Sequence, residues 1–408
     1  MRVHRMRTAA LAGIAALSMV VAACGSSGGT GTPSQSSSES SSSQSSQSSS
    51  SQQSSSSSGS GGSGSSADAK TATSASDFGG MDGLVAAAKK EGQLNVIALP
   101  PDWANYGAII KAFSAKYGIT VNSQNPNGSS AQEIEAAKTN AGTNTAPDVF
   151  DLGPAVALAS TDMFAPYKVQ AWADIPDANK EASGLWFNDY TGVMSVGYNK
   201  TKFGEITSLN DLLGAKFKGT FALNGNPTQA GAAFSGFVMV ALANGGSPDN
   251  LQPGIDFFKK AKDAGTFIPI DPTPATIASG QTGVVIDWSY NQLSAAQQLK
   301  KQGVDWAMYV PDNAAVGSYY VQAINKGAPH PAAARLWEEF LYTPEAQNLY
   351  MAGGAQPVEF EAMKKAGTLD ATAEASLPKT SSPIIQLTDA QQKAASTFLN
   401  SNWSKIAG

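Results

Sequence analysis

The stretch "GVMSVGYN", Gly192 to Asn199, is an extended run that interrupts the alternation of strand and helix patterns in this 408-residue chain. A second extended run, Ser318 to Ile324, precedes a long helix that we expect from about residue 331 to residue 342. We interpret the two runs as the connections by which the chain leaves one lobe and returns to it. The sequence thus predicts lobe 1 over residues 77–194 plus 323–408, and lobe 2 over residues 195–322.

Strand and helix patterns alternate on both sides of the first run. Before it, we expect helices over residues 83–91 and 103–117 and strands over residues 94–99, 119–121 and 148–150. Ser130 and Glu133 have the spacing of a capping box, which predicts that a helix begins there. After it, we expect strands over residues 221–223, 284–286 and 306–310 and a helix over residues 292–302. Such alternation is typical of an α/β fold with βαβ units and parallel sheet.

The N-terminus has the three parts of a secretory signal peptide. Arg2, Arg5 and Arg7 precede a short apolar stretch that ends in small residues, which predicts a signal peptide over residues 1–23. The sequence Val21-Ala-Ala-Cys24 resembles the bacterial lipobox, in which the cysteine becomes residue 1 of the mature protein and is lipidated. A stretch of Ser, Gly and Gln follows. We therefore expect residues 24–76 to be a lipidated Cys24 and a disordered linker, with the protein anchored on the extracytoplasmic face of the cell membrane.

Composition excludes several classes of function. The chain has 27 Lys+Arg and 32 Asp+Glu, and loss of a signal peptide with three Arg and no acid leaves a net charge of −8. An acidic chain is not expected to bind nucleic acid. Only His330 remains after His4 is removed, so a zinc site built from His and Cys is excluded and a Ser-His-Asp triad would depend on one residue. Asp148 and Asp151 could act as an acid/base pair, but two polar positions at a strand end are the more ordinary interpretation.

Five short motifs follow one another along the folded part of the chain: Glu91-Gly-Gln-Leu-Asn-Val-Ile97, Trp103-Ala-Asn-Tyr106, Pro147-Asp-Val-Phe150, Val196-Gly-Tyr-Asn199 and Thr343-Pro-Glu-Ala-Gln347. In this order they resemble the solute-binding lipoproteins of bacterial ABC importers, and most of all the spermidine/putrescine-type binding proteins. The resemblance implies a two-lobed type II periplasmic-binding-protein fold with a ligand cleft between the lobes. It also implies a monomer that is not an enzyme, needs no cofactor or metal, and delivers a small solute to ABC permease and ATPase subunits.

The resemblance also implies a set of residues for a polyamine. Trp103 and Tyr106 match an aromatic W-x-x-Y pattern after the first strand, and Tyr319 and Tyr320 match an aromatic pair at the return connection. Ammonium groups need carboxylates, and aromatic faces suit both the charge and the methylenes. Asp287 follows the strand over residues 284–286, and the carboxyl ends of strands are where open α/β sheets bind ligands. We expect Asp287 to pair with an ammonium group, with Trp288 or Tyr290 as a wall.

Other interpretations stay open. Trp103 could cover the apolar face of its own helix, Asp287 could cap a helix, and only one of Tyr319 and Tyr320 need face the ligand because neighbours alternate along a strand. Gln322 stands where polyamine binders often have an acid, and the turn over residues 224–231 has no acid. An organic anion such as a phosphonate, or ferric iron held by phenolates of Tyr290, Tyr319 and Tyr320, is therefore an alternative ligand. A surface hydrolase or an adhesin is an alternative of another class.

Overall fold

The structure, a computed structural model, describes residues 68–407. The expected signal peptide, Cys24 and residues 24–67 of the expected linker lie outside the described residues. The end of that linker, residues 68–76, differs from the prediction. Ala72 and Ala75 are buried, and Arg335 donates from Nε to the carbonyl of Ala72 at 2.8 Å. A buried guanidinium has to place its N–H groups on acceptors, and the backbone of this segment supplies them.

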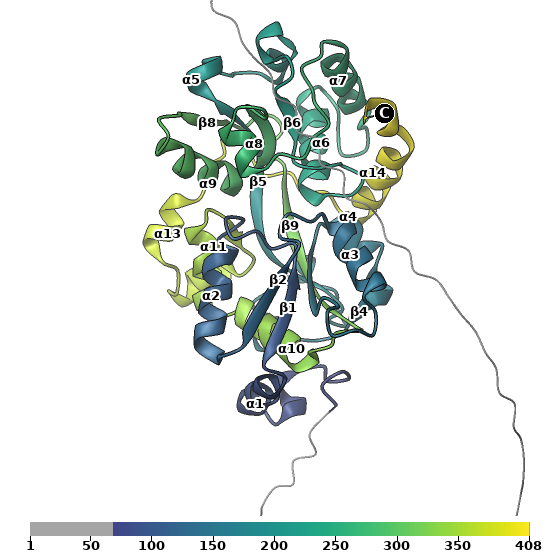
Figure 1. Cartoon of the computed structure of the whole chain (residues 1–408), viewed down its shortest axis with the longest axis vertical. Coiled ribbons are helices and arrows are strands. Elements are labelled where there is room, and N and C mark those ends of the chain that lie inside the picture. Colours follow the sequence, from purple (N-terminus) through teal and green to yellow (C-terminus); the bar gives the residue numbers. More distant parts are fainter. Residues whose placement is uncertain (1–67, 408) are drawn as a thin grey trace, which may run out of the picture. The chain divides into compact units, whose positions relative to one another are not determined.

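The fold is a mixed α/β arrangement around one branched sheet (Figure 1). The main path of this sheet has the order β3-β9-β5-β7-β6, with β10 and β8 paired to β5 and β4 paired to β9. A separate two-stranded sheet contains β1 and β2. The strands are β1 (Gln93–Ile97), β2 (Thr120–Gln124), β3 (Val149–Leu152), β4 (Phe164–Ala165), β5 (Phe187–Asn199), β6 (Phe221–Leu223), β7 (Val284–Trp288), β8 (Trp306–Tyr309), β9 (Gly317–Asn325) and β10 (Gln356–Pro357).

Strand direction confirms the prediction only in part. The expected parallel pairing occurs between β1 and β2 and between β6 and β7. In contrast, β5 is antiparallel to β7, β8, β9 and β10. The two extended runs of the sequence are β5 and β9, and they carry the chain in opposite directions. The strands β3 and β4 also pair with β9 antiparallel.

The long strand β5 belongs to two parts of the sheet. Residues 187–193 pair with β9, whereas residues 194–198 pair with β7. All of its residues except Asn199 are buried, as expected for a strand covered on both faces. We call β1–β4, β9, β10 and residues 187–193 of β5 the first half of the fold, and β6–β8 with the remainder of β5 the second half.

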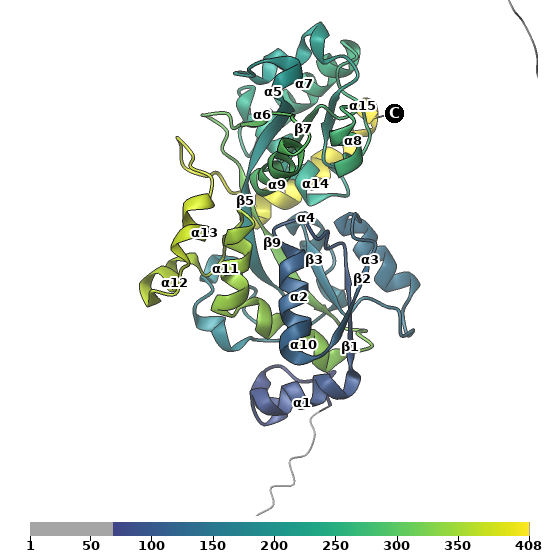
Figure 2. The same ribbon diagram turned by 60° about the vertical axis from the view of Figure 1, so that its left-hand side comes forward.

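The helices gather beside these two halves (Figures 1 and 2). Those beside the first half are α1 (Met81–Glu91), α2 (Tyr106–Tyr117), α3 (Ser130–Thr139), α4 (Pro154–Leu158), α10 (Pro331–Leu341), α11 (Pro344–Ala352), α12 (Phe360–Ala366) and α13 (Ala371–Ser376). Those beside the second half are α5 (Lys200–Phe203), α6 (Gly231–Ala243), α7 (Gln252–Asp263), α8 (Pro274–Ala278) and α9 (Ser289–Lys300). No helix within residues 68–407 is long and apolar enough to cross a membrane.

The C-terminal segment differs from the predicted lobe 1, which extended to residue 408. Helix α14 (Asp389–Asn402) contacts α4, and α15 (Ser404–Ala407) contacts α7. Between these helices the Trp403 ring lies 5.2 Å from that of Phe258 and 6.0 Å from that of Phe237. Helix α6 is buried along almost its whole length, so apolar groups must cover it on all sides. The Trp403 ring covers the side that carries Phe237. The chain end thus packs on both halves, with α14 on α4 of the first half and α15 on α7 of the second.

Two helix starts differ from the prediction. Helix α2 begins at Tyr106 and not near Trp103, because Ala104 and Asn105 have φ angles of 43° and 67°, which a right-handed helix does not allow. The capping box of α3 is one residue earlier than predicted and consists of Ser129 and Gln132. Both shifts matter for the site, since they place Trp103 on a loop and release Glu133 from capping.

Candidate ligand-binding site

A cavity of about 430 Å³ lies between elements of the two halves, in the size range of small-molecule sites. The first half contributes the loop after β1, the start of α3, and residues of β3 and β9. The second half contributes the turn between β6 and α6, helix α8, and the segment from the end of β7 into α9. The loops that follow β1, β6 and β7 place the cavity where open α/β sheets bind ligands.

The two halves touch at the edge of the cavity. The backbone N–H of Ala131 donates to the carbonyl of Gln229 at 3.2 Å. Gly153 and Gly231 meet backbone to backbone, with no side chain between them. Asp102, on the loop after β1, accepts a hydrogen bond from Gln298 of α9 at 3.2 Å. These contacts join the first half directly to the second and partly enclose the cavity.

The cavity wall contains acidic side chains but no basic ones. Five carboxyl groups line it, and the lining includes no Lys, Arg or His. Glu133, Asp151 and Asp287 are buried, whereas Asp102 and Asp271 are exposed. Amides and hydroxyls supply most of the remaining polar groups. A wall of this composition attracts cations and repels anions.

Asp287 lies at the carboxyl end of β7, as predicted, and is 7% exposed. Its Oδ1 accepts from the backbone N–H of Trp288 at 2.7 Å, and its Oδ2 accepts from Nδ2 of Asn291 at 3.0 Å. Burial raises the pKa of Asp287 to about 6. The carboxylate is therefore held in place by neutral donors, with no cation of the cavity wall to neutralise it.

Asp151 and Glu133 form a second buried acidic position. Oε2 of Glu133 accepts from the backbone N–H of Asp151 at 3.0 Å. Oδ2 of Asp151 accepts from the hydroxyl of Tyr190 at 3.1 Å, but its buried Oδ1 has no hydrogen-bond partner within the described chain. Burial is the main cause that raises the pKa of both carboxyl groups well above their ordinary values.

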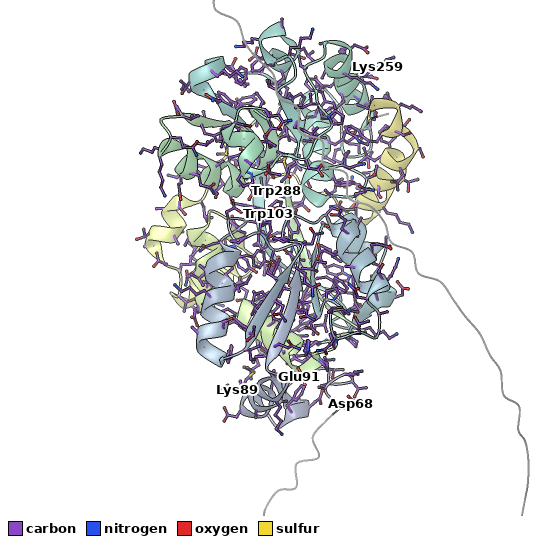
Figure 3. All side chains as sticks on the ribbon, viewed as in Figure 1. Asp68, Lys89, Glu91, Trp103, Lys259 and Trp288 are labelled. Atoms are coloured by element: carbon purple, nitrogen blue, oxygen red, sulfur yellow. The ribbon has the colours of Figure 1, made fainter. Side chains whose placement is uncertain are left out.

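The predicted aromatic residues separate into two groups. Trp103 and Tyr320 line the cavity, and Figure 3 shows Trp103 where the two halves meet. Tyr106, Trp288 and Tyr290 do not line it and are buried behind it. Tyr319 is also absent from the wall. The alternation of neighbours along β9 turns Tyr320 into the cavity and Tyr319 away from it.

The buried rings nevertheless support the wall. The indole of Trp103 lies 5.7 Å from the ring of Tyr290 and 5.8 Å from that of Tyr320. Nε1 of Trp288 donates to the Tyr320 hydroxyl at 3.2 Å. Tyr106 lies deeper, where its hydroxyl donates to Asp189 at 3.2 Å. We therefore place Trp288 and Tyr290 as supports of the two lining rings, and Tyr106 behind them against Tyr190.

Sequence reasoning missed Tyr190 and Glu133, and it gave Asp151 an ordinary role at a strand end. Tyr190 stacks on Tyr320 at 5.5 Å and accepts from Nε1 of Trp103 at 2.7 Å. Its only sequence signal is that it lies two residues before the predicted extended run that begins at Gly192, which is too general to mark a site. The other member of the proposed acidic pair, Asp148, is structural, because its carboxylate contacts Nδ1 of His330 at 2.8 Å.

The alternative functions find less support in the geometry. Of the three phenolate candidates for ferric iron only Tyr320 reaches the cavity, and the described residues contain no cluster of three or more His, Cys, Asp or Glu that could hold a metal ion. For an adhesin, an exposed apolar patch is expected. Among the described residues, the only exposed large hydrophobic side chain is Ile384.

Known structures with the same architecture are two-lobed binding proteins. The PBP AgtB of A. tumefaciens R10, in complex with agropinic acid, superposes with a TM-score of 0.60 at 16% identity over 78% of this chain and 98% of that chain. Iron-bound HitA of Pseudomonas aeruginosa gives a TM-score of 0.53 at 20% identity, over 76% of this chain and 98% of that chain. A putative spermidine/putrescine ABC transporter of Listeria monocytogenes gives a TM-score of 0.56 at 15% identity, over 77% of this chain and 98% of that chain. At such identities the likeness concerns the fold, and the fold is that of a two-lobed periplasmic binding protein.

A sequence profile of the bacterial extracellular solute-binding proteins matches residues 148–380, more than half of the chain. The chain belongs to this family. A comparison with curated protein sequences finds no match. Family membership indicates an extracytoplasmic location and a role in binding a small solute. The spermidine/putrescine subgroup, in contrast, is not distinguished, since the similar structures carry ligands as different as iron and agropinic acid.

Proposed function

We propose that this protein is the lipid-anchored substrate-binding component of an ABC importer and that it captures a small organic cation of the polyamine class. The observation that carries the ligand assignment is the composition of the cavity wall: five carboxyl groups and no basic side chain. A buried carboxylate without a cationic partner is costly. A ligand that brings positive charge into the cavity removes that cost.

Within this proposal Asp287 binds an ammonium group, and Trp103 and Tyr320 contact the ligand chain. Tyr320 and Trp103 both lie at the wall, and their rings offer apolar area to methylenes and electron-rich faces to ammonium groups. A phosphonate would find backbone N–H groups at the starts of α3 and α6, but it would share the cavity with Asp151 and Asp287. Repulsion by Asp287, which is ionised at neutral pH because its pKa is about 6, disfavours an anion.

Capture proceeds by hinge closure of the two predicted lobes. Support comes from β5 and β9, which are the two predicted connections and which pair with each other along the first half. The β5 ladder changes partner between residues 193 and 194, next to the predicted lobe boundary at residue 194. A small rotation there would separate the cavity walls, as in other proteins that close around a ligand.

The test is calorimetric titration of the full-length protein with spermidine, putrescine and a small phosphonate. We expect heat of binding from the amines and none from the phosphonate. Binding of the phosphonate without binding of either amine would replace the cation assignment by the anion alternative. Ferric citrate and thiamine belong in the same series, because a ligand that binds the folded state also raises the thermal midpoint.

A further inference from the structure

We propose that Asp151, with Glu133 beside it, is a second anchor for a cationic group, so that the site binds both ends of a diamine or polyamine whose other end is held by Asp287. This inference rests on the proposed function and adds to it the residues that hold the second ammonium group. It also assigns residues that the resemblance to polyamine binders did not supply.

The first argument is the unpartnered oxygen. Asp151 lines the cavity and is 5% exposed, yet its Oδ1 has no hydrogen-bond partner within residues 68–407. Buried polar atoms almost always have a partner, so one that does not calls for an explanation. An ammonium group entering from the cavity would provide the missing donor and the compensating charge.

The second argument is that the carboxylate is held in a fixed position. The hydroxyl of Tyr190 donates to its Oδ2, and that hydroxyl in turn accepts from the Trp103 indole. Glu133 is fixed on the other side by its hydrogen bond from the Asp151 backbone. A lining aromatic residue, a tyrosine and two carboxyl groups therefore form one connected unit, which is the preorganisation that a binding site requires.

The third argument is the aromatic surface near the two acidic positions. Tyr320 is near both of them, since its ring stacks on Tyr190, whose hydroxyl contacts Asp151, and its phenol interacts electrostatically with both Asp151 and Asp287. The same wall that holds the two carboxyl groups also carries an aromatic surface, which Tyr320 and Trp103 contribute. This arrangement matches a molecule with positive charges at its ends and methylenes in between. A metal dication lacks the apolar middle part.

The experiment compares putrescine with N-acetylputrescine, in which one ammonium group is replaced by a neutral amide. It uses the full-length parent, Asp151→Asn and Asp287→Asn, with Asp263→Asn as the control, because Asp263 is an exposed carboxylate of α7 outside the cavity wall whose loss removes the same formal charge. We expect Asp151→Asn to weaken putrescine at least tenfold and to weaken the acetylated amine less than threefold. Asp263→Asn should change either affinity less than threefold.

If Asp151→Asn binds putrescine and spermidine with affinities within twofold of those of the parent, the second anchor is overturned. The assignment of a cationic ligand then still stands. A parent that binds none of the amines overturns the proposed function itself. Thermal midpoints of all variants establish that they fold. If Asp151→Asn does not fold, Glu133→Gln replaces it, since a glutamine oxygen can still accept from the Asp151 backbone. Glu133→Gln should weaken putrescine binding at least threefold. An unchanged affinity for putrescine then counts against the anchor.

Discussion

Gly153 and Gly231 meet so closely that a Cβ atom on Gly231 would lie 2.8 Å from the Cα atom of Gly153. Gly153 follows β3 in the first half of the fold, and Gly231 is the first residue of α6 in the second half. The atoms that a Cβ would meet are backbone atoms at both glycines, and backbone atoms cannot change rotamer as a side chain can. The approach of the two halves at this edge of the cavity therefore depends on the absence of both side chains.

Gly231→Ala should prevent full closure without removing any group that contacts the ligand. We expect spermidine affinity to fall at least tenfold, and we expect small-angle scattering to show a smaller decrease in radius of gyration on ligand addition than for the parent. Gly327→Ala is the control, because a Cβ atom there would meet its nearest neighbour at an ordinary 3.5 Å. Unchanged affinity for Gly231→Ala would show that the contact is irrelevant to binding.

Ligand affinity should depend on pH through Asp287, whose pKa burial raises to about 6. The ionised carboxylate is needed for an ammonium ligand, so affinity should fall by about tenfold per pH unit below this pH. Asp287→Asn should weaken spermidine at least tenfold at pH 7.5, since a charge-assisted hydrogen bond contributes about 1.5–3 kcal/mol. Titrations of both proteins between pH 5 and pH 8 test this.

The same substitution should stabilise the empty protein. Because the native pKa lies above the ordinary value, the native state binds more protons than the unfolded chain between the two pKa values, and its stability decreases as pH rises through that window. Asp287→Asn removes the buried charge, so its thermal midpoint should exceed that of the parent above about pH 6 and approach it at lower pH. A lower midpoint at pH 7.5 would argue that the carboxylate is a structural group.

His330 should make stability depend on pH in a different window. Its hydrogen bond to Asp148 raises its pKa, so this contribution to the free energy of unfolding is fully present below the unfolded pKa of about 6.5. It is lost as pH rises through the folded pKa. Urea unfolding of His330→Asn and the parent should therefore differ most near pH 6 and least near pH 9. A difference that stays constant with pH would refute the assignment.

Cys24 offers a test of the membrane anchor. Cys24→Ser removes the only thiol of the chain, so lipidation at this position is impossible. We expect the variant to appear as unprocessed precursor or in the medium, whereas the parent fractionates with membranes and incorporates labelled palmitate. Membrane association and processing before residue 24 that persist in the variant would contradict the lipobox interpretation.

Local patterns predicted much of the fold because they depend on neighbouring residues. Helix α1 ends at Glu91 with Gly92 in the left-handed conformation, as a glycine after a helix pattern indicates. The two extended runs became β5 and β9. Asp287 could be expected at the cavity from sequence, because the end of a buried strand is a general place for ligand contacts.

The capping of α3 shows where such patterns stop being sufficient. Two boxes overlap in the sequence, Ser129 with Gln132 and Ser130 with Glu133, and either could begin the helix. The first forms, and Glu133 turns instead to the backbone N–H of Asp151. Asp151 is on another element, so no local signal could decide between the two boxes.

The sequence by itself determined the class of fold, the two extended runs and the acidic character of the protein, since these follow from periodicity and composition. Only the tertiary structure decided which acids face the cavity and which of Tyr319 and Tyr320 reaches it. It also decided that Tyr190 joins Trp103 to Asp151. These relations connect residues distant along the chain, and their energies arise from burial and from contacts that exist only after the elements have packed.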